Sequence, residues 1–139
     1  MLRTVEMESF IHLDPVKVKA EDDIFEAIHL LSAYRVSGAC VVDDGGYLVG
    51  VLSELDCLRA ILGSVYNESP VGKVGEFMTE NVITVKRTDN IVDVASDMLK
   101  HKHRRRPVVQ DDGLLIGQVT CRQLLAAVKE FGESRESGQ

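Results

Sequence analysis

The chain has 139 residues, of which 45% are apolar and 5% aromatic, with no Trp, and its formal net charge is −6. Such a length suits one compact domain, or two small halves that share an aliphatic core. The negative charge argues against a nucleic-acid or anionic-membrane partner, because polyanions are held by many Lys and Arg contacts.

Cysteine usage and hydropathy favour a reducing, aqueous location. The three cysteines, Cys40, Cys57 and Cys121, are odd in number and widely spaced, which predicts buried, reduced thiols and no zinc site. No apolar run approaches the roughly 18 residues that span a bilayer, and the first residues do not resemble a secretory signal. We therefore expect a cytoplasmic protein with no bound metal and no membrane insertion.

An internal duplication organises the chain. Shifting the sequence by 67 residues aligns 7–61 with 74–128 without a gap, and about a quarter of the aligned positions are identical. The identical pairs include Phe10/Phe77, Val18/Val85, Ile24/Ile91, Val41/Val108, Gly46/Gly113 and Gly50/Gly117. Self-similarity at a fixed spacing predicts two copies of one structural unit.

The duplication sets the expected domain boundaries. We place the first repeat at 7–62, a connecting loop at 63–73, the second repeat at 74–131 and a flexible tail at 132–139. The loop contains Pro and Gly, and the tail is rich in Glu, Ser and Gly. The repeats differ in charge, because the first aligned segment carries ten acids against four bases and the second seven against eight.

The first repeat predicts five elements in order. A short strand at Pro15–Lys19 precedes a helix whose apolar residues fall at i, i+3, i+4 and i+7. Those positions are Ile24, Ala27, Ile28 and Leu31. A hairpin follows with strands at 39–43 and 47–52, because Asp and Gly at 44–46 allow the backbone angles of a tight turn. A second helix is expected from Ser53 to about Leu62.

The second repeat predicts the same five elements. A strand is expected at Val82–Lys86, then a helix with the same apolar spacing at Ile91, Val94, Ala95 and Met98. The hairpin strands fall at 107–110 and 114–119, and the last helix runs from Thr120 to about Phe131. Each repeat is therefore β-α-β-β-α, which gives an α/β (α+β) fold. Neither repeat is large enough to bury its helices alone, so we expect one pseudo-twofold unit.

The segment Gly50-Val51-Leu52-Ser53-Glu54-Leu55-Asp56 joins a predicted strand to a predicted helix. A helix start presents unpaired backbone N–H groups and a positive dipole end, which suit a phosphate or a ribose hydroxyl. The same residues also fit a capping box, in which Ser53 and Asp56 only tie off the helix start. Both interpretations remain open for Ser53, and likewise for Thr120 and Gln123 in the second repeat.

The order of these motifs resembles a tandem pair of CBS domains, regulatory modules first named from cystathionine β-synthase. The resemblance covers about Met7 to Val128. The residues that carry it are Cys40-Val41-Val42-Asp43-Asp44, Pro107-Val108-Val109-Gln110-Asp111, Gly50-x-x-Ser53-x-x-Asp56, Gly117-x-x-Thr120 and the segment from Val74 to Val85. It implies two repeats packed as one CBS-domain pair, with two clefts that bind AMP, ADP, ATP, S-adenosylmethionine or NAD(H).

The resemblance also implies roles for individual residues. Ser53 and Thr120 would assist phosphate binding, and Asp56 would hold ribose hydroxyls, whereas Gln123 replaces the second acid. A charge-assisted hydrogen bond contributes about 1.5 to 3 kcal/mol, against roughly 0.5 to 1.5 for a neutral one. We therefore predict two unequal sites, of which the one that uses Asp56 binds more tightly.

The run Lys100–Arg106 leads into Pro107, and the resemblance assigns phosphate contacts to its Arg104 and Arg105. Arg106 falls where the family prefers an apolar residue. The alternative is a solvated helix end whose cations complement the helix dipole. Thr84 matches a position that often touches the ligand, although it is also an ordinary strand residue. The predicted nucleotide-binding set is Ser53, Asp56, Thr84, Arg104, Arg105, Pro107, Thr120 and Gln123.

Two functions follow as hypotheses. The first is a stand-alone ligand-sensing module that binds an adenine nucleotide as a regulatory ligand and signals to an unknown effector protein. The second is a constitutive interaction scaffold without nucleotide affinity. We expect no catalytic cofactor and no enzyme, since no acid, base and nucleophile pattern is present. The resemblance also implies a homodimer formed through the second helix of each repeat, with Leu55, Leu58, Ile61, Leu62, Leu124, Leu125 and Val128 as its apolar residues.

Overall fold

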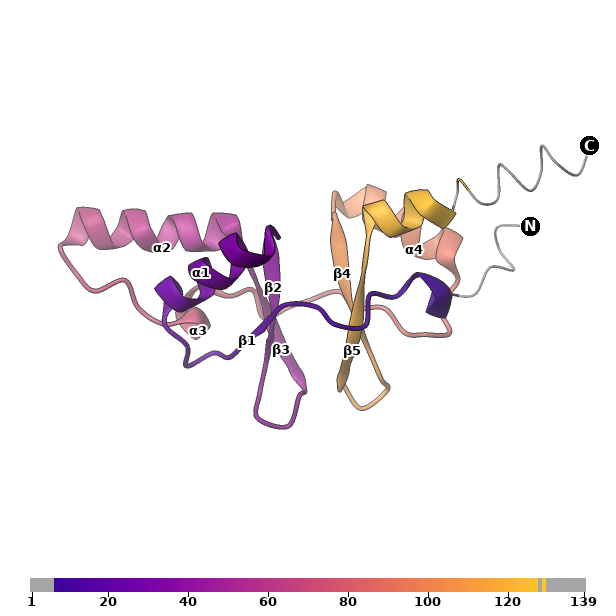
Figure 1. Ribbon diagram of the computed structural model, residues 1–139, viewed down its shortest axis with the longest axis horizontal. Coiled ribbons are helices and arrows are strands. Elements are labelled where there is room, and N and C mark those ends of the chain that lie inside the picture. The colour runs from indigo at the N-terminus through magenta and orange to yellow at the C-terminus, as the bar shows by residue number, and fades with distance from the viewer. Residues whose placement is uncertain (1–6, 128, 130–139) are drawn as a thin grey trace, which may run out of the picture. The chain divides into compact units, whose positions relative to one another are not determined.

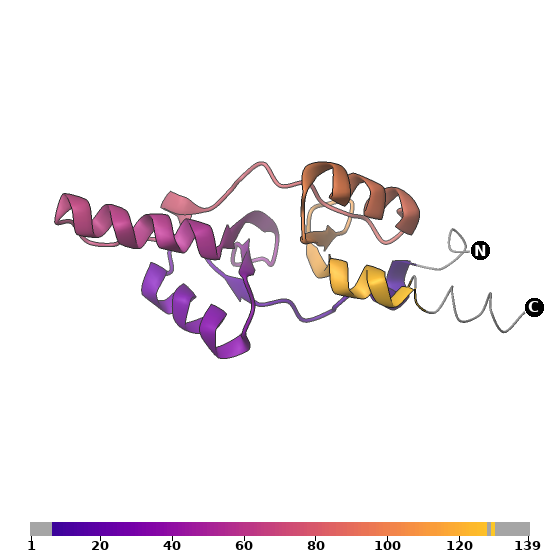
Figure 2. The ribbon, with the colours of Figure 1, turned by 90° about the horizontal axis from the view of Figure 1, so that it is seen from above.

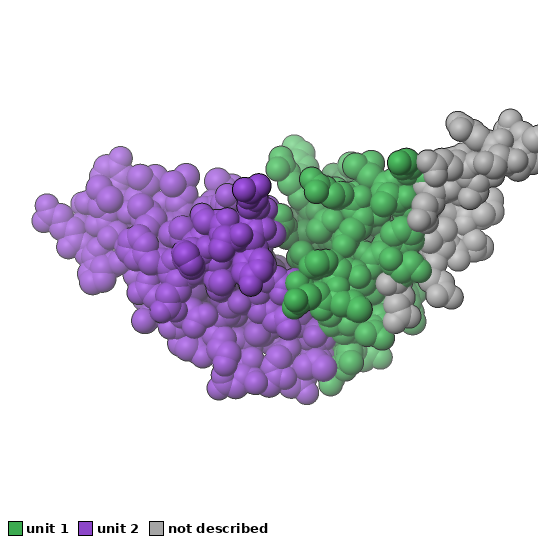
Figure 3. All heavy atoms as spheres, viewed as in Figure 1, with its two compact units in different colours: residues 1–14, 83–112, 116–139 green, residues 15–82, 113–115 purple. Residues whose placement is uncertain are grey.

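The computed structural model describes residues 7–127 and Lys129 (Figure 1). The predicted tail 132–139, Val128 and the predicted helix end at Phe131 lie outside the described residues. The chain forms two compact units, coloured separately in Figure 3. Unit 2 comprises Pro15–Val82 and Gly113–Leu115, and unit 1 comprises the chain up to Asp14, Ile83–Asp112 and the chain from Ile116 onwards.

Unit 2 holds a three-stranded sheet in the order β1-β2-β3. Its strands are β1 (Lys17–Val18), β2 (Gly38–Val42) and β3 (Leu48–Ser53), and its helices are α1 (Ile24–Tyr34), α2 (Glu54–Asn67) and α3 (Val74–Phe77). β1 pairs with β2 in parallel and β2 with β3 antiparallel. The core between sheet and helices includes Val18, Ile24, Leu31, Val41, Leu52, Cys57 and Val74. Figure 2 shows α1 and α2 side by side.

Unit 1 repeats this arrangement with fewer sheet contacts. It contains the 3-10 helix η2 (Met7–Phe10), α4 (Ile91–His101), β4 (Arg105–Val109), β5 (Leu115–Thr120) and helical residues 121–127. The predicted strand at 82–86 is reduced to one parallel bridge between Val85 and Val108. The core includes Phe10, Val85, Ile91, Met98, Val108, Val119 and Leu124.

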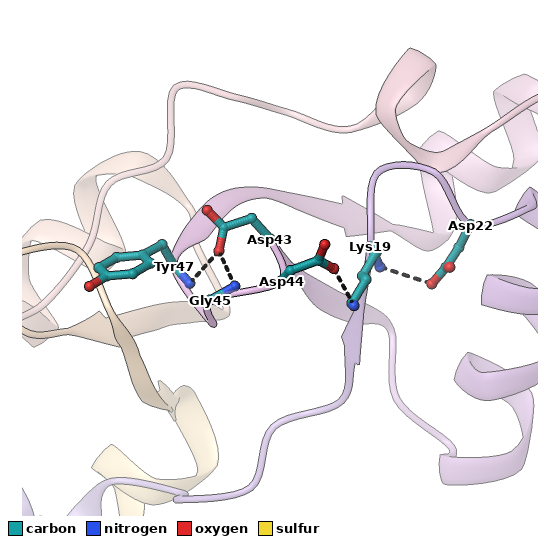
Figure 4. Close-up of polar contacts among 6 residues, drawn as sticks. All are labelled: Lys19, Asp22, Asp43, Asp44, Gly45 and Tyr47. Atoms are coloured by element: carbon teal, nitrogen blue, oxygen red, sulfur yellow. Dashed lines mark hydrogen bonds and ion pairs between the residues drawn. The ribbon is translucent and has the colours of Figure 1, made fainter.

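The first hairpin turn is fixed by its own side chains (Figure 4). Asp43 Oδ1 accepts the N–H of Gly45 and of Tyr47, both at 3.0 Å. Gly46 adopts φ 87°, which favours glycine. Asp44 forms an ion pair with Lys19 at the end of β1, and that pair keeps the turn beside the neighbouring strand. The turn predicted from Asp and Gly is therefore confirmed.

The segment that opens each repeat, around residue 12 or residue 79, pairs with a hairpin strand of the other repeat. His12 donates its N–H to Gln118 O at 2.8 Å and accepts from Gln118 N at 3.0 Å, within unit 1. In unit 2, Thr79 exchanges the same two bonds with Val51, at 2.9 and 3.0 Å. Residues 12 and 79 occupy equivalent positions of the duplication, so the exchange is reciprocal.

Two expectations about elements and side chains were wrong. The helix after Ser53 continues to Asn67, past the predicted end at about Leu62, and stops where Glu68 takes a left-handed conformation. Gly63 is tolerated inside it, because one glycine weakens a helix without ending it. Cys121 is exposed, although buried thiols were predicted; Cys40 and Cys57 are buried, and no disulfide joins any of the three.

Candidate functional site

Ser53 and Asp56 form a capping box, which is one of the two roles that the sequence predicts for them. Ser53 ends β3 and caps α2, and its Oγ accepts the Asp56 N–H at 3.1 Å. In return, Asp56 Oδ2 accepts the Ser53 N–H at 2.9 Å. Two backbone donors at the helix start are thereby satisfied within the helix itself.

Asp56 has a further partner on its own helix. Its Oδ1 lies 3.0 Å from Arg59 Nη1, and the residue is 7% exposed. A carboxylate has about four acceptor positions, so each oxygen retains capacity for another donor. The cap is thus present, and a ribose contact by Asp56 stays a prediction.

Thr120 and Gln123 build a neutral version of the same cap. Gln123 Oε1 accepts the Thr120 N–H at 2.9 Å and the Thr120 hydroxyl at 3.2 Å. Gln123 N in turn donates to Thr120 Oγ1 at 3.3 Å. The amide therefore replaces the carboxylate in its capping role without changing the geometry of the helix start.

Strand alternation separates the three arginines of the basic run. Successive side chains of a strand point to opposite faces of a sheet. Arg106 lies on the face of β4 that contacts α4, because it reaches Asp97 of that helix and its face-mate Val108 belongs to the core. Arg105 and Pro107 consequently lie on the opposite face. Arg104 precedes the strand and lines a groove beside α4.

Thr84 precedes the Val85 bridge and is half-buried. Val85 N donates to Pro107 O at 2.9 Å, and the Val85 side chain is buried in the core. We group Thr84 with Arg105 and Pro107, because alternation next to Val85 predicts that its side chain lies on the opposite face. The same alternation from buried Val119 turns Thr120 to this face of β5. We call Thr84, Arg105, Pro107 and Thr120 the open-face set, after the face of the sheet opposite α4; Pro107 is itself buried, and the other three are half-buried.

The open-face set offers one cation and two hydroxyls on one face of a small sheet. Arginine presents a planar fork of donors that suits phosphate oxygens. In unit 2 the equivalent positions carry Lys17, Gly38, Cys40 and Ser53. Lys17 is exposed and lies beside Cys40 in the β1–β2 register, so unit 2 also has a cation on this face. The sequence signal for Lys17 was its alignment with Thr84.

Neither a metal centre nor a membrane span is found in the part of the chain that the structure describes. No cluster of three His, Cys, Asp or Glu side chains there could hold a metal ion. No helix within residues 7–127 is both long and apolar enough to cross a bilayer.

Comparisons with known proteins agree on one family. A family model described as CBS domain matches residues 7–63 and again 74–130. The crystal structure of CBSX2 in complex with AMP superposes with a TM-score of 0.82 and 31% identity, covering 91% of this chain and 98% of that one. The CBS domain pair of protein MJ0100, in complex with 5'-methylthioadenosine and S-adenosyl-L-methionine, gives 0.77 and 25%, covering 94% and 98%.

A curated relative is much longer than this chain. Inosine-5'-monophosphate dehydrogenase of Aquifex aeolicus is 32% identical over 88% of the chain, which spans only 24% of that protein. The similarity therefore concerns one part of the dehydrogenase.

Proposed function

The chain belongs to the CBS domain family, as two tandem repeats of a mixed α/β fold, and on that premise we propose that it is a regulatory module for an adenosine-containing ligand. AMP, ADP and ATP are the first candidates, followed by S-adenosylmethionine and NAD(H). The support from relatives is that CBSX2 was crystallised with AMP and the MJ0100 pair with two adenosine derivatives.

The observation that carries the proposal is the open-face set of unit 1. A helix start attracts anions through its dipole, and Thr120 caps such a start on the same face as Arg105. Thr84 adds a second hydroxyl beside β4. We propose that the phosphate lies near Arg105 and Thr120 and that Gln123 contacts the ribose while it also accepts its capping bond.

The capping contacts of unit 2 favour the second candidate function. Ser53 and Asp56 satisfy each other, and Arg59 neutralises the carboxylate. If these groups serve the cap alone, and Thr120 and Gln123 do likewise, the module is a constitutive interaction scaffold without nucleotide affinity. The predicted tight site at Asp56 requires that the carboxylate accept ribose hydroxyls in addition to the cap.

Isothermal titration calorimetry with AMP, ATP, NADH and S-adenosylmethionine distinguishes the two functions. For the sensor, one ligand binds, and Arg105→Gln weakens it by about 10-fold or more, because a charge-assisted hydrogen bond is lost. Arg35→Gln is the matched control, since Arg35 is an exposed arginine outside the predicted nucleotide-binding set. The absence of binding heat for all four ligands would reject the sensor and favour the interaction scaffold.

Asp56→Asn tests the predicted order of the two sites. It keeps the shape of the cap and removes the charge, so the sensor hypothesis predicts weaker binding of the tighter ligand with a small change in stability. An equal loss of stability and of affinity would assign Asp56 to capping.

We also propose a homodimer formed through the helices. In α2 the apolar residues Leu55, Leu58 and Leu62 are exposed, at 71%, 55% and 46%, and follow one helix face. In unit 1, Leu99 and Leu125 are exposed beside a groove of ≈ 510 Å³. A second copy would cover these faces. Light scattering tests this: a dimer is expected, and Leu58→Glu should yield monomers, whereas the exposed Leu13→Glu should not.

The remaining assignments concern location and partners. We propose a cytoplasmic module that is not an enzyme and that acts on an effector protein through a surface that changes on ligand binding. Three cysteines without a disulfide suit a reducing compartment. Chromatography of the nucleotide after incubation with the protein tests the non-enzymatic assignment. Conversion of any bound nucleotide to a product would contradict it.

A further inference from the structure

Arg106 is a buried cation in a position where the first repeat carries Ala39. It is the last residue of the chain's most basic run, Lys100–Arg106, yet it is only 3% exposed. A buried charge is costly unless it is paired. The contacts of Arg106 therefore decide how the start of β4 is held.

Two side chains contact the Arg106 guanidinium, one through an ion pair and one through a hydrogen bond. Nη2 lies 2.7 Å from Asp97 Oδ2 on α4, at angles outside a regular hydrogen bond, so this contact is an ion pair. Nε donates to His103 Nδ1 at 3.1 Å. His103 follows the left-handed cap Lys102 that ends α4. The arginine thus ties the helix and its end to the strand.

The second contact specifies the protonation state of His103. Arginine can only donate, so Nδ1 must present its lone pair, and the neutral ring carries its proton on Nε2. A protonated ring would direct an N–H at Arg106 Nε and place a second positive charge beside a buried guanidinium. Burial and the Arg106 charge accordingly lower the pKa of His103 below its ordinary 6.5.

The groups around His103 come from three elements. From α4, the His101 ring lies 5.4 Å away between centroids, and Asp97 Oδ2 lies 3.4 Å from His101 Nδ1. From β4 comes Arg106. From the last helix, Cys121 Sγ donates to the His103 carbonyl at 3.6 Å. Asp97 is the anion of this cluster, and its charge opposes the loss of a proton from His103.

We propose that His103, Arg106 and Asp97 form a proton-operated lock, which ties α4 to β4 at neutral pH and opens when mild acid protonates His103. The neutral ring is favoured by the fold, so its stabilisation is complete above the unfolded pKa of about 6.5. It is lost as the pH falls through the lower folded value. Asp97 stays ionised meanwhile, because Arg106 holds its pKa below 3.8.

The lock adjoins the open-face set. Arg104 O accepts the Cys121 N–H at 2.9 Å, which joins the start of β4 to the start of the last helix. Arg105 and Pro107 flank Arg106 in the strand. Opening the lock would loosen the strand residues that carry the proposed ligand contacts.

Imidazole nitrogen NMR on the full chain tests the lock directly. At neutral pH we expect His103 as the Nε2–H tautomer, and on acidification it should protonate below the midpoint of a free histidine peptide in the same buffer. A proton on Nδ1, or a midpoint at or above that of the peptide, would overturn the proposal.

A pair of variants gives a second readout. His103→Asn places an amide oxygen where Nδ1 accepts the bond and cannot titrate, whereas His29→Asn changes an exposed histidine of α1 as the control. Urea unfolding at about pH 7.5 and about pH 5.5 should show a loss of stability in the wild type and in His29→Asn. His103→Asn should remove most of that loss; an unchanged loss contradicts the lock. If His103→Asn does not fold, the NMR titration decides.

One further measurement, which rests on the proposed function, links the lock to the ligand. AMP affinity should fall between about pH 7.5 and a pH below the His103 midpoint found by NMR, and this fall should be about fivefold larger in the wild type than in His103→Asn. The AMP phosphate titrates near pH 6 and affects both proteins alike. Equal falls would disprove the coupling to the ligand. If AMP binds at neither pH, the proposed function fails, and the NMR result still judges the lock.

Discussion

A Cβ atom at position 50 would lie 2.7 Å from the carbonyl oxygen of Thr79, so only glycine fits where β3 meets the opening segment of the second repeat. The equivalent Gly117 faces the His12 carbonyl at still closer range. Gly50 and Gly117 therefore mark the two places where an opening segment crosses a strand of the sheet. Their role is close approach of backbones, as a missing side chain permits.

Gly50→Ala should destabilise the protein by about 1 to 3 kcal/mol, since backbone and Met78 must shift to admit the methyl group. Gly63→Ala is the matched control, because Gly63 lies inside α2 with nothing within 4 Å of an added Cβ. It should stabilise the protein by roughly 0.5 to 1 kcal/mol. Urea unfolding measures both, and equal effects would refute the close-approach explanation.

Ser53→Ala should cost about 0.5 to 2 kcal/mol of stability, because the Asp56 N–H loses its acceptor at the start of α2. Ser96→Ala, an exposed change inside α4, should be neutral or slightly stabilising, as alanine is the better helix former. Thermal unfolding without ligand gives the comparison. A Ser53→Ala protein as stable as the wild type would show that the cap contributes nothing.

Asp97→Asn should destabilise the protein at neutral pH, because Arg106 stays buried without its counter-ion. The Arg106 guanidinium holds the pKa of Asp97 below its ordinary 3.8, so this stabilisation is present above that value and lost as the pH falls below it. The variant should therefore show a flatter loss of stability in strong acid. Arg106→Met removes the buried charge itself, so it should lower the stability at neutral pH by less than Asp97→Asn does. A larger loss for Arg106→Met would contradict the ion pair.

Cys121 should react alone among the three cysteines when the native protein meets a thiol reagent. It is exposed, whereas Cys40 and Cys57 are buried, and burial raises the pKa of the Cys57 thiol. Absorbance with a disulfide reagent should show one fast equivalent that Cys121→Ser removes. Two further equivalents should appear in urea. A fast reaction of the Cys121→Ser protein would mean that local opening of the fold readily exposes Cys40 or Cys57 to the reagent.

Local patterns in the sequence predict most of the fold. The spacing of Ile24, Ala27 and Leu31 predicts the face that α1 buries, and the Asp and Gly residues at 44–46 predict the turn. The CBS family is confirmed, and the first repeat has the β-α-β-β-α order, whereas the second keeps only the Val85 bridge in place of its first strand. These features depend on neighbours in the sequence, which periodicity and turn chemistry report well.

Features that depend on distant partners could not be predicted in this way. A run of basic residues indicates a solvated face, and only the position of Asp97 on α4 shows that Arg106 turns inward. Cys121 looked like a buried thiol because its exposure depends on the helix face it occupies. The assignments of Ser53, Asp56, Thr84, Arg104, Arg105, Pro107, Thr120 and Gln123 to a nucleotide stay predictions.

The reciprocal pairing of His12 with Gln118 and of Thr79 with Val51 has a consequence for a repeat on its own. An isolated repeat would lack a partner for its leading segment and would complete its sheet only by trading that segment with a second molecule. Within one polypeptide, the tether raises the effective concentration of each half for the other.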